Sequence, residues 1–118
     1  MIFVFLDDGT LDVIANLEEA RRDYEGIDVE NGVYRFFDET GGYLEPKFTK
    51  PNKTGRLLGI LSWVESGQFE LIPNSDSDDD INLYLAEASE INSNPFFSSL
   101  EEVRRFLQKN RSEQKILS

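Results

Sequence analysis

The densest group of side chains that could do chemistry is the acidic run Asp76-Ser77-Asp78-Asp79-Asp80. Carboxylates are the ligands that Ca²⁺ prefers, and the alternate aspartates of this run would stand at positions one, three and five of an EF-hand loop. The sixth position must be glycine for the sharp turn, but this chain has Ile81, and Pro73 excludes the entering helix. The run therefore indicates a solvated loop that places negative charge ahead of a helix, with contact to a basic partner as the functional alternative.

Two other motifs lack the residue that their chemistry needs. Phe5-Leu6-Asp7-Asp8-Gly9-Thr10-Leu11 is superficially similar to the Asp-x-Asp-Gly-Thr signature of haloacid-dehalogenase-like phosphatases, but Leu6 stands where the nucleophilic aspartate would be. Lys53-Thr54 is similar to the end of a phosphate-binding loop, but no Gly-x-x-x-x-Gly precedes it. The 23 acids supply many carboxylate pairs for acid–base catalysis, and their spacing selects none of them.

The chain also has no histidine and no cysteine among its 118 residues. Histidine is the usual general base near neutral pH, and cysteine is the strongest side-chain nucleophile. Both are common metal ligands, so their absence lowers the expectation of a zinc or iron–sulfur centre. The composition favours a binding protein over an enzyme, with no cofactor and no metal site expected.

The net charge of −11 is distributed in blocks. Residues 1–45 carry twelve acids and three bases, whereas residues 46–63 carry four bases and no acid. Residues 64–90 carry eight acids and no base. The blocks either neutralise one another on a solvated surface or leave one strongly negative face that fits a basic partner. With a pI near 4.3, nucleic acid is not the expected partner.

The hydrophobic pattern predicts the elements that position these charges. We expect strands at 2–6, 11–15, 33–37, 43–48, 57–64 and 69–72, and helices at 17–25, 81–90 and 99–109. Asp8-Gly9 between the first two strands is a hairpin signal. Residues 49–56 are expected to form an exposed loop, and 57–64 a central buried strand that contains Trp63.

Two segments leave alternatives open. Residues 81–90 alternate like a strand but also fit a helical face, and their Ala and Glu content favours a helix. Asn94-Pro95-Phe96-Phe97 is expected to turn into the last helix. Its two phenylalanines are expected to pack in the core, with an exposed anchor as the alternative.

These elements predict an α+β fold, an antiparallel sheet of five or six strands with the helices packed largely on one face. Residues 1–110 are expected to form one domain, and 111–118 a frayed tail. No apolar run is long enough to span a membrane, so no membrane partner is expected. The N-terminus is interpreted as a first strand and not as a signal peptide, and the lack of cysteine fits a cytoplasmic protein.

The order of several short segments resembles a known class of proteins. These segments include Ile27-Asp28-Val29-Glu30-Asn31-Gly32, Phe69-Glu70-Leu71-Ile72-Pro73 and Asn94-Pro95-Phe96-Phe97-Ser98-Ser99-Leu100-Glu101. Over nearly its full length the chain resembles the small, acidic, stand-alone bacterial proteins often encoded beside polymorphic or contact-dependent toxins. This resemblance implies an immunity protein that binds a cognate toxin domain and blocks its active site, and it assigns no binding residue.

The predicted partner-binding surface follows from the charge blocks. It comprises Asp76, Asp78, Asp79 and Asp80, with Glu65 and Glu70 on the neighbouring hairpin. A second candidate patch comprises Asp23, Glu25, Asp28 and Glu30. Charge reversal at 78–80 is expected to weaken toxin binding without lowering the melting temperature. The alternatives are a small enzyme that uses carboxylates or a divalent metal, and a phage-type or structural interaction protein.

Overall fold

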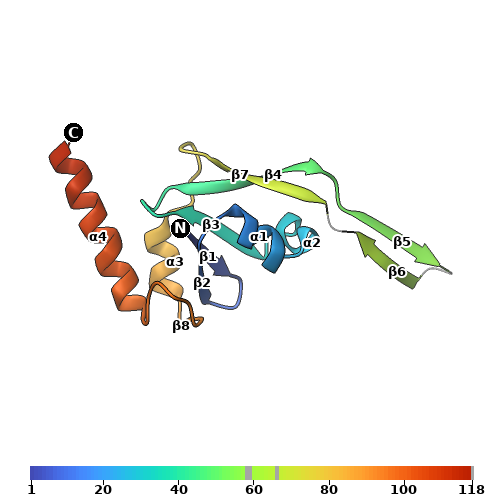
Figure 1. Ribbon diagram of the computed structural model, residues 1–118, viewed down its shortest axis with the longest axis horizontal. Coiled ribbons are helices and arrows are strands. Elements are labelled where there is room, and N and C mark those ends of the chain that lie inside the picture. The colour runs from blue at the N-terminus through green and yellow to red at the C-terminus, as the bar shows by residue number, and fades with distance from the viewer. Residues whose placement is uncertain (58–59, 66, 118) are drawn as a thin grey trace.

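A six-stranded mixed sheet forms the centre of the protein (Figure 1). The computed structural model describes residues 1–57, 60–65 and 67–117, with side chains described for residues 1–53 and 67–110. The strands of this sheet are β1 (Ile2–Leu6), β2 (Thr10–Ile14), β3 (Tyr34–Asp38), β4 (Tyr43–Lys50), β7 (Gln68–Pro73) and β8 (Glu90–Ile91). Their order is β7-β4-β3-β1-β2-β8, and every pair is antiparallel except β2 with β8. The predicted α+β class with five or six strands is confirmed.

The β1–β2 hairpin forms where the Asp-Gly pair predicts it. Gly9 has a φ of 88°, a conformation that residues with a Cβ rarely adopt. The Asp8 carboxylate accepts a hydrogen bond from the Thr10 amide at 3.0 Å, which holds the turn closed. The register that follows places Phe5 opposite Leu11.

The helices cover both faces of the sheet, which corrects the expectation that they pack largely on one. Ile2 and Val4 of β1 belong to a core with α1 (Leu17–Asp23) and α2 (Gly26–Glu30). Phe3 and Phe5 belong to a second core with α3 (Ile81–Glu87) and α4 (Leu100–Leu117). Successive side chains of a strand point to opposite faces, so a strand that is apolar at every position needs cover on both.

The helix prediction for residues 81–90 is confirmed for its first seven residues. After α3 the chain becomes extended at Ala88, and the Ser89 amide donates to the Gly9 carbonyl at 2.9 Å. The Asn92 amide donates to the Leu11 carbonyl at the same distance. The free edge of β2 therefore converts the end of the expected helix into strand β8, because it offers carbonyl groups that need donors.

The first helix is shorter than predicted and is followed by a helix that the pattern did not indicate. Asn16 caps α1 by accepting from the Glu19 amide at 3.0 Å. The chain leaves the helix at Tyr24, and Gly26, the residue after the predicted helix at 17–25, begins α2. Glycine is a poor helix former, so no local signal in the sequence marks α2.

Residues 49–65 differ most from the prediction. Strand β4 continues to Lys50, and β5 (Lys53–Leu57) pairs with β6 (Ile60–Glu65) in a separate two-stranded sheet at one end of the molecule (Figure 1). The expected loop and central strand are therefore wrong. Pro51 has no amide hydrogen, so the ladder of β4 is interrupted before β5 begins. The predicted burial of Trp63 lies outside the described side chains, as do the side chains of the tail at 111–118.

Candidate functional site

The acidic loop before α3 forms one wall of a shallow hollow of about 230 Å³. Its lining residues are Asp78, Asp79, Asp80, Leu83, Tyr84 and Glu87. Three of the predicted binding residues therefore lie together, and none of the described residues that line the hollow is basic. Leu83 is 64% exposed in the middle of this acidic surface.

Asp79 is held by the protein itself. The Tyr84 hydroxyl donates to Asp79 at 2.8 Å, and the Arg35 guanidinium lies 3.9 Å from the same carboxylate. Burial, together with the bond to Asp79, raises the pKa of Tyr84, so the phenol remains the donor near neutral pH. Asp79 therefore connects α3 to strand β3, and reversing its charge would place a cation beside Arg35.

Asp80 also has a structural role, because it is the N-cap of α3. Its carboxylate accepts from the Asn82 amide at 2.9 Å, which satisfies one of the donors at the start of the helix. Charge reversal at Asp79 or Asp80 is therefore expected to lower the melting temperature. The expectation of an unchanged melting temperature holds only for reversal at Asp78.

Replacing Asp80 by alanine is expected to lower the free energy of unfolding by about 1 kcal/mol, the usual cost of losing an N-cap. Asp80→Asn retains the acceptor while removing the charge, so it is expected to be close to wild type in stability. Urea titrations of both variants measure the difference. Equal losses in the two would show that the charge, and not the cap, stabilises α3.

Asp78 and Glu87 have carboxylates available to a partner. Both are exposed, and among the described residues neither side chain makes a hydrogen bond or an ion pair. They lie on either side of Leu83 in the chain and line the same hollow. An apolar side chain between unpaired carboxylates suits a basic surface that also has an apolar contact.

A neighbouring hollow of about 390 Å³ extends this surface toward the β1–β2 turn. It is lined by Asp7 and Asp8, and it shares Tyr84 and Glu87 with the first hollow. Sequence reasoning interpreted Asp7 and Asp8 only as a turn. No local signal could have placed them beside α3, because the contact depends on the Ser89–Gly9 hydrogen bond. We call these two hollows together the α3 surface.

The other predicted binding residues lie elsewhere. Asp76 is in the same loop and exposed, but it does not line the α3 hollows. Glu70 lies on β7 opposite Lys47 of β4 and does not line them either. Glu65 belongs to β6, and its side chain is outside the described residues.

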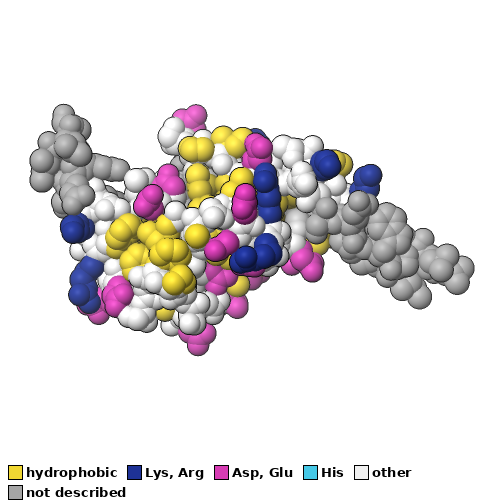
Figure 2. All heavy atoms as spheres, viewed as in Figure 1, with side chains coloured by type: hydrophobic (Ala, Val, Ile, Leu, Met, Phe, Trp, Pro, Cys, Tyr) yellow, Lys and Arg dark blue, Asp and Glu magenta, His cyan; other side chains and the backbone are white. Residues whose placement is uncertain are grey.

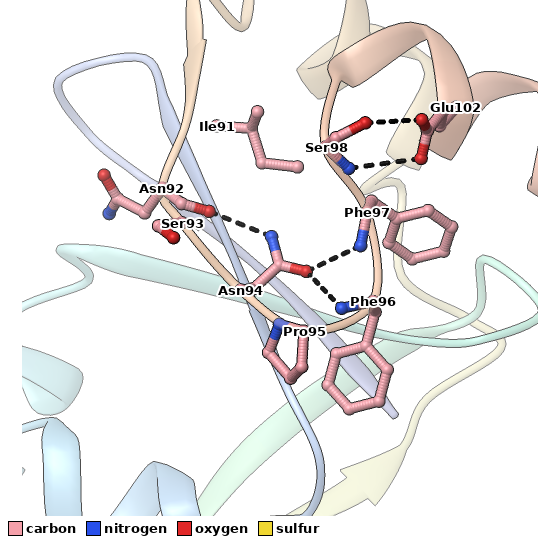
Figure 3. Close-up of a pocket in the computed structure, with 9 residues that line it drawn as sticks. All are labelled: Ile91, Asn92, Ser93, Asn94, Pro95, Phe96, Phe97, Ser98 and Glu102. Carbon is pink, nitrogen blue, oxygen red and sulfur yellow. Dashed lines mark hydrogen bonds between the residues drawn. The ribbon is translucent and has the colours of Figure 1, made fainter.

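The loop at residues 92–98, between β8 and α4, lines an open hollow of about 600 Å³ (Figures 1 and 3). The Asn94 side-chain oxygen accepts from the amides of Phe96 and Phe97 at 2.9 and 2.8 Å. Its side-chain nitrogen donates to the Asn92 carbonyl at 2.9 Å. Asn94 thus closes the turn into α4 that the sequence predicts.

Asp12 connects this loop to α1. It accepts from the Tyr24 hydroxyl at 2.7 Å on one oxygen and from the Asn92 side chain on the other. A hollow of about 330 Å³ lies here, lined in part by Asp12, Glu19 and Asp23. Of the second candidate patch, Asp23 lines this hollow, and Glu30 accepts from Asn52 at 2.8 Å.

The Tyr24 hydroxyl makes the free energy of unfolding depend on pH in the alkaline range. Burial raises the pKa of its hydroxyl well above the usual value of about 10, and the bond to Asp12 adds to the effect. The unfolded chain loses this proton first, so stability is fully present below about pH 10 and falls as the pH rises further. Tyr24→Phe is expected to show a shallower alkaline decline in urea titrations. An unchanged decline would contradict the assignment to Tyr24.

Within the described residues, no group of three or more carboxylates is arranged to hold a metal ion. Nor does any helix in that part of the chain have the length and apolar character required to cross a bilayer. No family model matches the sequence, and neither a curated protein nor a solved structure resembles it significantly.

Proposed function

We propose that this chain is a non-enzymatic binding protein, a cytoplasmic bacterial immunity protein that neutralises a cognate toxin domain through the α3 surface. The observation that carries the proposal is that the carboxylates of Asp78 and Glu87, which have no partner among the described residues, flank an exposed Leu83. Among the side chains that the structure describes, no Lys or Arg lines the hollows of this surface. A toxin domain that acts on nucleic acid has a basic cleft, which such a surface would complement and occupy in place of phosphate.

The electrostatic part of the proposal determines how the complex responds to salt. The net charge of −11 speeds association with a cationic partner, and added salt screens this attraction. The contact of Leu83 is apolar and does not weaken with salt. Higher ionic strength is therefore expected to slow association strongly and to change dissociation little.

The test uses the C-terminal domain of the protein encoded immediately upstream of this gene, which the proposal expects to be the toxin. Expressed alone, that domain is expected to arrest growth, and co-expression of this chain is expected to restore it. The purified pair is expected to form a complex whose association rate falls with salt, measured by biolayer interferometry. Absence of both protection and a complex would overturn the immunity proposal. Protection with a salt-independent association rate would exclude the acidic surface as the site.

A further inference from the structure

We propose that the loop at residues 92–98 and the hollows beside it form a second docking surface, for an extended peptide segment that carries Lys or Arg next to an apolar side chain. This surface shares no lining residue with the α3 surface. It goes beyond the proposed function, and it does not depend on whether the α3 surface binds a toxin.

The two hollows here adjoin the same stretch of chain. One is lined by residues 91–98 and Glu102, and the other by parts of β2, α1 and the loop. They share Asn92, Ser93, Asn94 and Pro95. A segment laid across these four residues would enter both hollows, which suits an extended peptide better than a single side chain.

The loop is held in one conformation before any partner arrives. Asn94 makes three hydrogen bonds within it, and Ser98 donates to Glu102 from both its amide and its hydroxyl (Figure 3). The Phe97 ring packs with Phe3 and Phe106, at centroid distances of 5.9 and 5.3 Å. Because the loop is already ordered, binding there does not require the entropic cost of fixing it.

Phe96 supplies an aromatic contact on this fixed backbone. It is 42% exposed, whereas the adjacent Phe97 is turned into the core. The rings of Pro95 and Phe96 both point away from the Ser98–Glu102 pair (Figure 3). Figure 2 shows hydrophobic side chains gathered between α4 and α1, with acidic and basic side chains around them. An exposed aromatic on a rigid loop is typical of an interface anchor.

The charges around the loop determine the chemistry of the occupant. The lining carboxylates are Asp12, Glu19, Asp23 and Glu102, and within the described part of the chain no Lys or Arg lines either hollow. Arg22 pairs with Asp23 at 2.9 Å and also attracts Glu19, and Arg105 attracts Glu102, so neighbouring arginines offset part of the charge of a lining that is itself acidic. Like charges across an interface are strongly unfavourable, so the surface rejects acidic segments and fits cationic ones.

In the test, the isotope-labelled full chain is titrated with a short peptide of alternating arginine and leucine. The chemical shifts of the backbone amides of the chain are followed by NMR. Two control peptides carry glutamate in place of arginine, or serine in place of leucine. The arginine–leucine peptide is expected to shift the amides of residues 92–98, and both controls are expected to bind at least tenfold more weakly. Equal binding of the glutamate peptide, or no shift at 92–98, would overturn the proposal.

A pair of matched variants separates the two surfaces. Phe96→Ser is expected to weaken binding of the peptide about tenfold or more. The melting temperature of this variant is expected to be unchanged because the Phe96 side chain is exposed. Leu83→Ser removes the exposed apolar side chain of the α3 surface and is expected to leave this binding unchanged. If only Leu83→Ser weakens the peptide and the shifts lie on α3, the second surface is excluded and the proposed function stands.

Discussion

Phe3→Ala is expected to lower the free energy of unfolding by about 3–5 kcal/mol, the usual cost of removing a phenylalanine from a packed core. Phe3 is fully buried, and its ring packs with Phe97 and Phe106. The substitution leaves a cavity between β1 and the first half of α4 that surrounding side chains fill only in part. A loss of this size is a large fraction of the 5–15 kcal/mol typical of single domains.

Urea denaturation measures this loss, with Leu83→Ala as the matched control. Leu83 is also a large apolar residue but is 64% exposed, so its truncation is expected to change stability by less than about 0.5 kcal/mol. A Phe3→Ala variant within about 1 kcal/mol of wild type would contradict the packing of β1 against α4. If the variant is unfolded in buffer, Phe3→Leu, which retains much of the volume, is expected to fold with a smaller loss.

The second large effect is on binding: the double variant Asp78→Lys, Glu87→Lys is expected to weaken the toxin complex about 10–100-fold. Each substitution places a cation where the proposed partner is basic, and like charges across an interface cost free energy and slow association. Its melting temperature is expected to match wild type, because neither carboxylate has a described partner in the fold. Biolayer interferometry and a thermal melt measure the two quantities.

The control for this double variant makes the same change in net charge elsewhere. Glu18 and Glu39 are exposed, line neither hollow of the α3 surface, and make no described side-chain bond. Glu18→Lys, Glu39→Lys is therefore expected to reduce affinity far less, through the long-range field alone. Equal losses in the two double variants would show that net charge, and not the α3 surface, determines the affinity.

Local signals predicted the parts of this fold that depend on neighbouring residues. Asp8-Gly9 specifies the hairpin because Asp8 bonds Thr10 two residues away. Asp80 and Ser99 mark the starts of α3 and α4 because each accepts from an amide within three residues. These bonds form within one turn of chain, so the sequence contains all the information that they need.

The parts of the fold that depend on residues distant in the sequence could not be predicted in the same way. Glu90 and Ile91 form a strand only because β2 lies beside them, about eighty residues earlier in the chain. The uninterrupted apolar sequence of β1 indicates that both its faces are buried, but not which helix covers which. The pairing of β5 with β6 in a separate sheet likewise depends on which strands lie side by side, which the pattern of residues 53–57 and 60–65 does not show.

The same distinction between local and long-range features applies to the candidate site. The acidic composition, the lack of histidine and cysteine, and the carboxylate run before a predicted helix are evident from the amino-acid sequence. Which of those carboxylates remain available to a partner depends on the three-dimensional fold. Asp79 and Asp80 are used within the fold, whereas Glu87 is brought beside Asp7 and Asp8. The reason is physical: charge is a property of each residue, whereas a surface is created by the long-range pairing that brings distant residues together.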